Sequence, residues 1–272
     1  MRLERGNTSR PPAVAGLFYP DDAHELRDVV SGYLRQHSAN ASITPPKALI
    51  VPHAGYIYSG GIAAAAYATV ASLRQSIRRV VLIGPSHRVY LRGMAVPAAS
   101  SFATPLGNLE IDQTLKASLL QSGAVIESDT PHAQEHSLEV QLPFLQLLFE
   151  DFTLLPLVLG SVEPEHVAAA LANVWGDSAT LVLVSSDLSH YHAYAHAQQI
   201  DSATSAAILR RETTLGGEQA CGAVGINGLL YLAGQRQLSI AEIARCNSGD
   251  TAGDRSRVVG YGAFAVHEPA NA

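Results

Sequence analysis

Short, continuous apolar runs recur along this chain, and segments with helical periodicity separate most of them. Residues 48–51, 79–83 and 180–184 are three such runs, rich in Val, Leu and Ile. A strand that is apolar at consecutive positions is buried on both faces, as in a parallel sheet between two helical layers. The pattern therefore predicts an α/β sandwich with a mainly parallel mixed sheet covered by helices.

Composition narrows the class of protein. Of the 272 residues, 47% are hydrophobic and only 15% are charged, a balance that excludes intrinsic disorder. The 18 Lys and Arg residues against 24 Asp and Glu give a net charge of −6, which argues against nucleic-acid binding. No apolar run approaches a membrane span, and the first residues lack a secretory signal. We therefore expect a cytoplasmic protein with no membrane partner, in which Cys221 and Cys246 are free thiols.

The domain organisation is simple. No linker rich in Pro, Ser or charge interrupts residues 45–267, and no internal repeat is present. We expect one domain over residues 12–267, between an N-terminal tail, residues 1–11, and a C-terminal tail, residues 268–272.

Histidines follow three of the predicted strands. His53 and His87 come directly after the first two, and His190 follows the third, three positions after Asp187. In open α/β sheets, ligands bind beyond the carboxyl ends of the strands, so neighbouring strands would bring these imidazoles together. Neutral imidazole is the commonest protein ligand for transition metals. The alternative is that each histidine is an ordinary loop residue.

Six short segments resemble the Memo family in content and order. They are AGLFYP at 15–20, PHAGY at 52–56, GPSH at 84–87, EHSLE at 135–139, SSDLSH at 185–190 and ACG at 220–222. The closing NSGD and VGY sequences are similar to the prokaryotic branch called AmmeMemoRadiSam system protein B. The resemblance extends from about residue 12 to residue 267.

The resemblance implies a fold similar to class III extradiol dioxygenases, which bind non-haem Fe(II) with two His and one Glu. In Memo proteins the corresponding pocket is associated with two His and one Cys, and with iron or copper. Carried over by position, the implied metal ligands are His53, His87 and Cys221, and the implied catalytic residues are His190 and Asp187. Glu135 and His136 match a further family motif and are expected in the pocket or around the ligands. Tyr56, close to His53, is expected to wall the pocket or to pack as an ordinary aromatic residue.

These residues favour a Memo-like metal-binding protein, a non-haem iron- or copper-dependent oxidoreductase of dioxygenase type acting on a small molecule. A thiolate softens the ligand set and favours Fe(II) or Cu, with Zn as a further candidate, over Mg or Ca. We also expect a metal or nearby histidines to lower the pKa of the Cys221 thiol. The alternatives are a non-enzymatic binding or adaptor module and a metal-dependent hydrolase. The family label further implies AMMECR-type and radical-SAM proteins as partners.

Overall fold

The computed structural model describes residues 8–37 and 44–269. Their main sheet has nine strands in the order β10-β12-β2-β9-β3-β8-β4-β7, with β11 paired to β12. The strands are β2 (Ala48–Val51), β3 (Arg79–Pro85), β4 (Met94–Val96), β7 (Ile126–Glu127), β8 (Thr153–Leu159), β9 (Thr180–Ser185), β10 (His190–His192), β11 (Ser239–Asn247) and β12 (Val258–His267). A second sheet contains β1 (Ser9–Arg10), β5 (Ser101–Thr104) and β6 (Gly107–Glu110).

The centre of the main sheet is parallel and its flanks are mixed. β2 pairs in parallel with β9, β9 with β3, and β3 with β8. β12 runs antiparallel to β2, β10 and β11, and β4 runs antiparallel to β8. The predicted mainly parallel mixed sheet is therefore confirmed.

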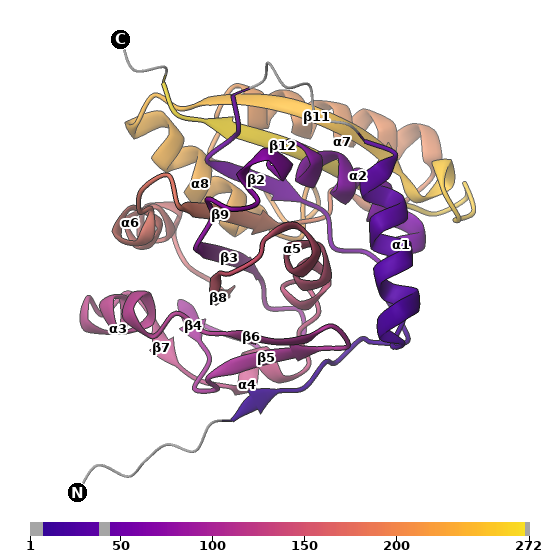
Figure 1. The fold of residues 1–272 in the computed structure, drawn as a ribbon. Helices are drawn as coiled ribbons and strands as arrows, with labels where there is room; N and C mark the ends of the chain where they lie inside the picture. Colours follow the sequence, from indigo (N-terminus) through magenta and orange to yellow (C-terminus); the bar gives the residue numbers. More distant parts are fainter. Residues whose placement is uncertain (1–7, 38–43, 270–272) are drawn as a thin grey trace, which may run out of the picture.

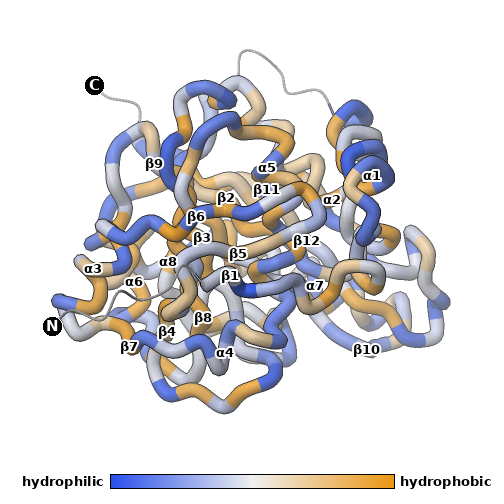
Figure 2. The backbone as a smooth tube through the Cα atoms, turned by 60° about the horizontal axis from the view of Figure 1, so that its bottom comes forward, coloured by the Kyte–Doolittle hydropathy of each residue, from blue (hydrophilic) through white to orange (hydrophobic). Residues whose placement is uncertain are grey.

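Helices cover both faces of this sheet (Figure 1). One layer contains α1 (Ala23–Arg35), α2 (Tyr56–Ala68) and α5 (Leu142–Leu148), and the other contains α3 (Gln113–Gln121), α6 (Pro164–Val174), α7 (Tyr194–Leu209) and α8 (Ala223–Gln235). The short elements are α4 (Thr130–Ala133) and the 3-10 turns η1 (Ala71–Leu73), η2 (Glu139–Gln141) and η3 (Ser248–Asp250). Figure 2 shows hydrophobic backbone concentrated in the central strands and hydrophilic residues along the outside of α1.

Two apolar cores explain the continuous runs. In β9, Leu181 and Leu183 pack into the core beneath α1, α2 and α5. Val182 and Val184 point the other way, into the core beneath α6 and α8. Successive side chains of a strand alternate between faces, so a strand covered on both faces is apolar at every position. The predicted α/β sandwich is confirmed.

Some details of the sheet lay outside the sequence predictions. β11, an edge strand with half-exposed positions, was not predicted. β1 lies within the segment expected as an N-terminal tail, and its Arg10 is buried. Among the described residues, no helix combines the length and the hydrophobicity that a membrane crossing requires.

Candidate metal centre

The carboxyl ends of three adjacent parallel strands form the floor of the site. β2, β9 and β3 lie side by side in that order, and their ends lead directly into His53, Asp187 and His87. The rings of His53 and His87 lie 5.3 Å apart, centroid to centroid, at an interplanar angle of 75°. The expected convergence of these two strand ends is confirmed.

A third imidazole comes from a different part of the chain. His136, in the segment between α4 and η2, stacks on His87 with a centroid separation of 4.7 Å and lies 5.4 Å from the His53 ring. One ring nitrogen from each of the three histidines lies within 4.8 Å of the other two. The geometry thus supports His53, His87 and His136 as a group able to hold a metal ion.

Hydrogen bonds to the far side of the rings orient two of these ligands. Nδ1 of His53 lies 2.9 Å from Oγ of Ser185, and Nδ1 of His87 lies 2.8 Å from Oε1 of Glu135. Each contact leaves Nε2 available, and such outer partners commonly fix the tautomer and direction of a metal-binding histidine. The arrangement is therefore compatible with a metal ion bound through Nε2.

The protein environment keeps the imidazoles of His53 and His136 neutral. Complete burial lowers the pKa of His53 well below its ordinary value, and the neighbouring His136 and His87 lower it further. Burial also lowers the pKa of His136, to about 4. Only neutral imidazole has a free lone pair for a metal, so at neutral pH both rings are ready to bind one.

Glu135 supplies the negative charge beside the cluster. Burial raises its pKa, but hydrogen bonds from the His87 side chain and from the backbone N–H groups of Ser137 and His87 outweigh this effect, and the resulting pKa is about 2. The N–H groups of His87 and Ser137 lie 2.6 Å and 2.9 Å, respectively, from its oxygens. Oε1 also lies 3.4 Å from Nδ1 of His136. The carboxylate is therefore ionised and contacts two of the three histidines.

Cys221 lies against the cluster but outside the group of three. Its Sγ is 3.3 Å from Nε2 of His53 and accepts a hydrogen bond from the N–H of Asp187 at the same distance. Burial, reinforced by the charge of Asp187, raises the pKa of the thiol to about 12. Neighbouring histidines therefore do not lower this pKa as expected, because His53 beside the sulfur is itself neutral.

Gly222 explains how the cysteine comes so close to the strand end. It is the N-cap of α8, and a Cβ at this position would lie 2.6 Å from Cβ of Ser186 and 2.7 Å from the carbonyl oxygen of Ser185. Only glycine fits without displacing the end of β9.

Asp187 and His190 line a cavity on the His136 side of the cluster, with a volume of about 430 Å³. Oδ1 of Asp187 accepts the N–H of His53 at 2.7 Å, yet burial raises the pKa of this carboxyl to about 7. Burial also lowers the pKa of His190. Near neutral pH, Asp187 is thus close to a change of protonation state, whereas His190 is neutral.

The two tyrosines near His53 have different surroundings. Tyr56 is buried against Phe144, at a centroid distance of 5.1 Å, and its hydroxyl donates to the carbonyl of Val140 at 2.8 Å. Tyr58 lines the cavity. Of the two expectations for Tyr56, a pocket wall or ordinary aromatic packing, the structure shows aromatic packing in the core.

A buried ion pair supports the His136 segment from outside, and sequence reasoning missed it. Arg10 of β1 pairs with Glu139 and donates to the carbonyls of Glu135 at 2.6 Å and His132 at 3.0 Å. Glu139 also accepts from the hydroxyl of Tyr19 at 2.6 Å. The only feature of the sequence that pointed to this ion pair was that Glu139 belongs to the EHSLE segment.

Comparison with known proteins shows the family of this chain. The profile of the Memo-like protein family matches residues 10–265. A MEMO1 family protein from Aquifex aeolicus is 36% identical over 93% of this chain and 97% of its own length. One from Ignicoccus hospitalis is 36% identical over 96% and 99%, and one from Thermoplasma volcanium 33% identical over 94% and 98%. An uncharacterised Escherichia coli protein of known structure overlaps with a TM-score of 0.49 at 14% identity, over 80% of this chain and 98% of its own. The chain belongs to the Memo family.

Proposed function

We propose that this protein is a metal-dependent oxidoreductase of dioxygenase type, with iron or copper held by His53, His87 and His136. The observation that carries the proposal is the cluster of three ligand nitrogens within 4.8 Å of one another. Two of the rings are oriented through their other nitrogen by Ser185 and Glu135. A purely structural group of histidines would not need three ring nitrogens that face one another.

The donor set fits a first-row transition metal. Imidazole suits Fe, Cu and Zn, whereas Mg and Ca prefer oxygen ligands. Sγ of Cys221, next to Nε2 of His53, is a further donor once its proton is lost, and a thiolate moves the preference toward softer ions. When bound, iron or copper supplies the redox chemistry with O2 that side chains lack.

The residues of the cavity complete the proposed site. His190 is a general acid or base for the substrate, since its imidazole lines the same cavity as His136 and Asp187. Asp187, with a pKa of about 7, holds or releases a proton near neutral pH. Phe18, Tyr58 and Tyr261 wall the cavity and exclude water around a bound organic molecule.

The test is metal-dependent O2 consumption. Protein purified anaerobically is loaded with Fe(II), Cu(I) or Zn(II) and assayed with a panel of catechols and related phenols in an oxygen electrode. We expect substrate-dependent O2 uptake with iron or copper, its loss in His53→Ala, and normal uptake in His24→Ala, whose imidazole is exposed on α1. Hydrolysis of esters or amides with Zn(II) alone would favour a hydrolase, and tight metal binding with neither activity would favour a binding module.

A further inference from the structure

A single arginine stands at the mouth of the cavity beside the metal centre. Among the described residues that line this cavity, Arg257 is the only Lys or Arg. Its side chain forms no ion pair with a carboxylate of the described residues, although Arg255, two positions away, does. Asp254 also lines the cavity, but it is exposed and accepts the N–H of Ser256. A cation that lines a cavity and has no carboxylate partner attracts an anion.

The residue whose ring contacts this arginine has an unusual backbone conformation. Tyr191 has a φ of +63°, in the left-handed region that non-glycine residues seldom occupy. The Tyr191 ring lies 5.1 Å from the guanidinium carbon of Arg257, a cation–π distance. Strain of this kind is commonly retained at ligand-binding positions.

The rest of the cavity is suited to a flat organic molecule. Three aromatic side chains from separate parts of the chain, Phe18, Tyr58 and Tyr261, contribute to its wall. The volume of about 430 Å³ is at the low end of the range for small-molecule sites. His136 and His190 also line it, so a molecule inside would contact both the metal-binding cluster and the proposed acid–base histidine.

We infer that the substrate class is a small aromatic acid whose carboxylate pairs with Arg257 while its ring lies against the aromatic wall. The planar guanidinium matches a carboxylate with two parallel hydrogen bonds. A phosphate would call for further cations or backbone donors, and the cavity offers one arginine. This inference rests on the proposed function for its reaction but not for the binding contact itself.

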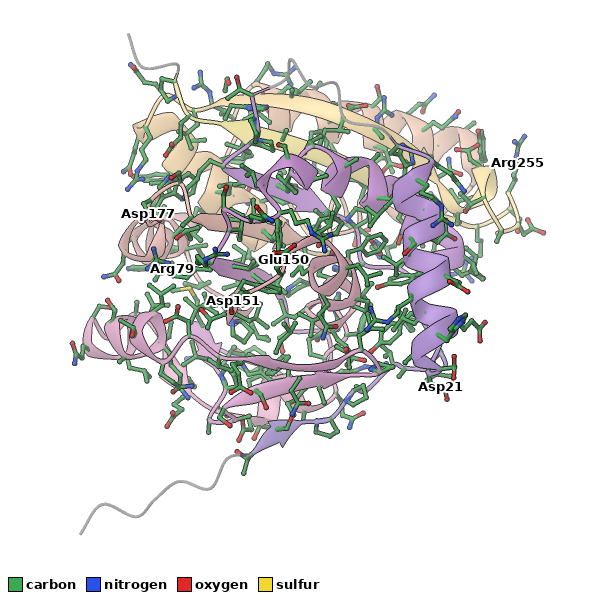
Figure 3. All side chains as sticks on the ribbon, in the orientation of Figure 1. Asp21, Arg79, Glu150, Asp151, Asp177 and Arg255 are labelled. Atoms are coloured by element: carbon green, nitrogen blue, oxygen red, sulfur yellow. The ribbon has the colours of Figure 1, made fainter. Side chains whose placement is uncertain are left out.

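The test measures binding to metal-free protein, so that no metal can capture the acid. Isothermal titration calorimetry in EDTA compares benzoate with its neutral analogue benzamide. We expect wild-type protein to bind benzoate at least tenfold more tightly than benzamide, and Arg257→Gln to remove that difference. The matched control is Arg255→Gln, two positions away, whose side chain points outward at the edge of the molecule (Figure 3) and stacks on Tyr194 outside the cavity.

The outcomes separate this inference from the proposed function. Benzoate binding that Arg257→Gln leaves unchanged, or that Arg255→Gln weakens equally, overturns the inference whatever the metal does. Benzoate binding that depends on Arg257, in a protein that takes up no metal on titration, supports the aromatic-acid site and overturns the metal centre instead.

Discussion

His53 and His87 are held in place by strands of the sheet, whereas His136 is held in place by polar contacts of an irregular segment. The first two follow parallel strands at the centre of a nine-stranded sheet, where backbone pairing and two apolar cores fix the strand ends. His136 lies in an irregular segment between α4 and η2. That segment is held by polar contacts to Arg10, near the start of the described chain.

The two kinds of support make one part of the site more tolerant of mutation than the other. The position of a strand end in the core is fixed by many apolar contacts and ladder hydrogen bonds, so the loss of any one of them has little effect. The segment around His136 depends on a few buried polar groups, and a buried charge that loses its partner is strongly destabilising. Disturbing the two supports should therefore have different consequences.

The largest effect is expected from breaking the ion pair between Arg10 and Glu139, both almost fully buried. Arg10→Met leaves the Glu139 carboxylate uncompensated and should lower the free energy of unfolding by about 3–5 kcal/mol. Urea denaturation measures this change. Because each single variant strands a charge, the double variant Arg10→Met/Glu139→Gln should cost less than the sum of Arg10→Met and Glu139→Gln.

The matched control is an ion pair at the surface. Arg79 of β3 pairs with Asp177 at 3.1 Å, and the two side chains lie next to each other in Figure 3. Exposed pairs contribute little, so Arg79→Met should barely change stability. Equal losses in Arg10→Met and Arg79→Met would contradict the special dependence of the His136 segment on Arg10.

The next effect is a pH dependence of the same segment. Burial lowers the pKa of His132 in α4 to about 4, below the ordinary value of the unfolded chain. The unfolded state therefore binds more protons between pH 6.5 and pH 4, and stability falls as the pH falls through this range. This titration lowers the free energy of unfolding by about 3 kcal/mol in total; the loss is absent at pH 7 and complete below the folded-state pKa.

His132→Gln tests this dependence, since glutamine retains a donor for the carbonyl of Ala95, which Nε2 of His132 contacts at 3.1 Å. Unfolding free energies measured from pH 7 to pH 4 should fall less steeply in this variant than in the wild type. His24→Gln, exposed on α1, should keep the wild-type slope. A wild-type slope in His132→Gln as well would rule out His132 as the source.

A smaller effect separates the two candidates for the third ligand. His136→Ala should weaken binding of Zn(II) or Co(II) by more than the roughly 10–100-fold that loss of an outer-shell partner costs. Cys221→Ser should cost less, because a thiol with a pKa of about 12 must release its proton before it binds. Chelator competition at pH 7 measures both, and a larger loss in Cys221→Ser would restore the ligand set His53, His87 and Cys221.

The smallest effect concerns the contact between the two supports. Oγ of Ser185, at the end of β9, contacts His53 and donates to the carbonyl of Ser137 at 2.6 Å. Ser185→Ala should reduce metal affinity about tenfold, the lower end for an outer-shell partner, and leave the fold intact by circular dichroism. An unchanged affinity would mean that backbone contacts alone orient His53.

The same comparison explains what could be predicted from sequence. The apolar runs specified the central strands, and their parallel order brought His53 and His87 together by topology alone. His136 follows no strand, so its position depends on long-range contacts such as that between Arg10 and the carbonyl of Glu135, 125 residues apart. β11 escaped prediction because its half-exposed side chains lack the continuous apolar pattern. The raised pKa of the Cys221 thiol likewise follows from burial, which spacing does not reveal.

The most direct test of the metal centre is the metal content of His53→Ala. Its imidazole is buried at the centre of the cluster, in contact with the other two rings and with Cys221. After anaerobic loading with Fe(II) and gel filtration, mass spectrometry of the metal should find about one ion per chain in wild type and His24→Ala. His53→Ala should retain little or none. Full metal content in His53→Ala would contradict the assignment of the histidine cluster as a metal centre.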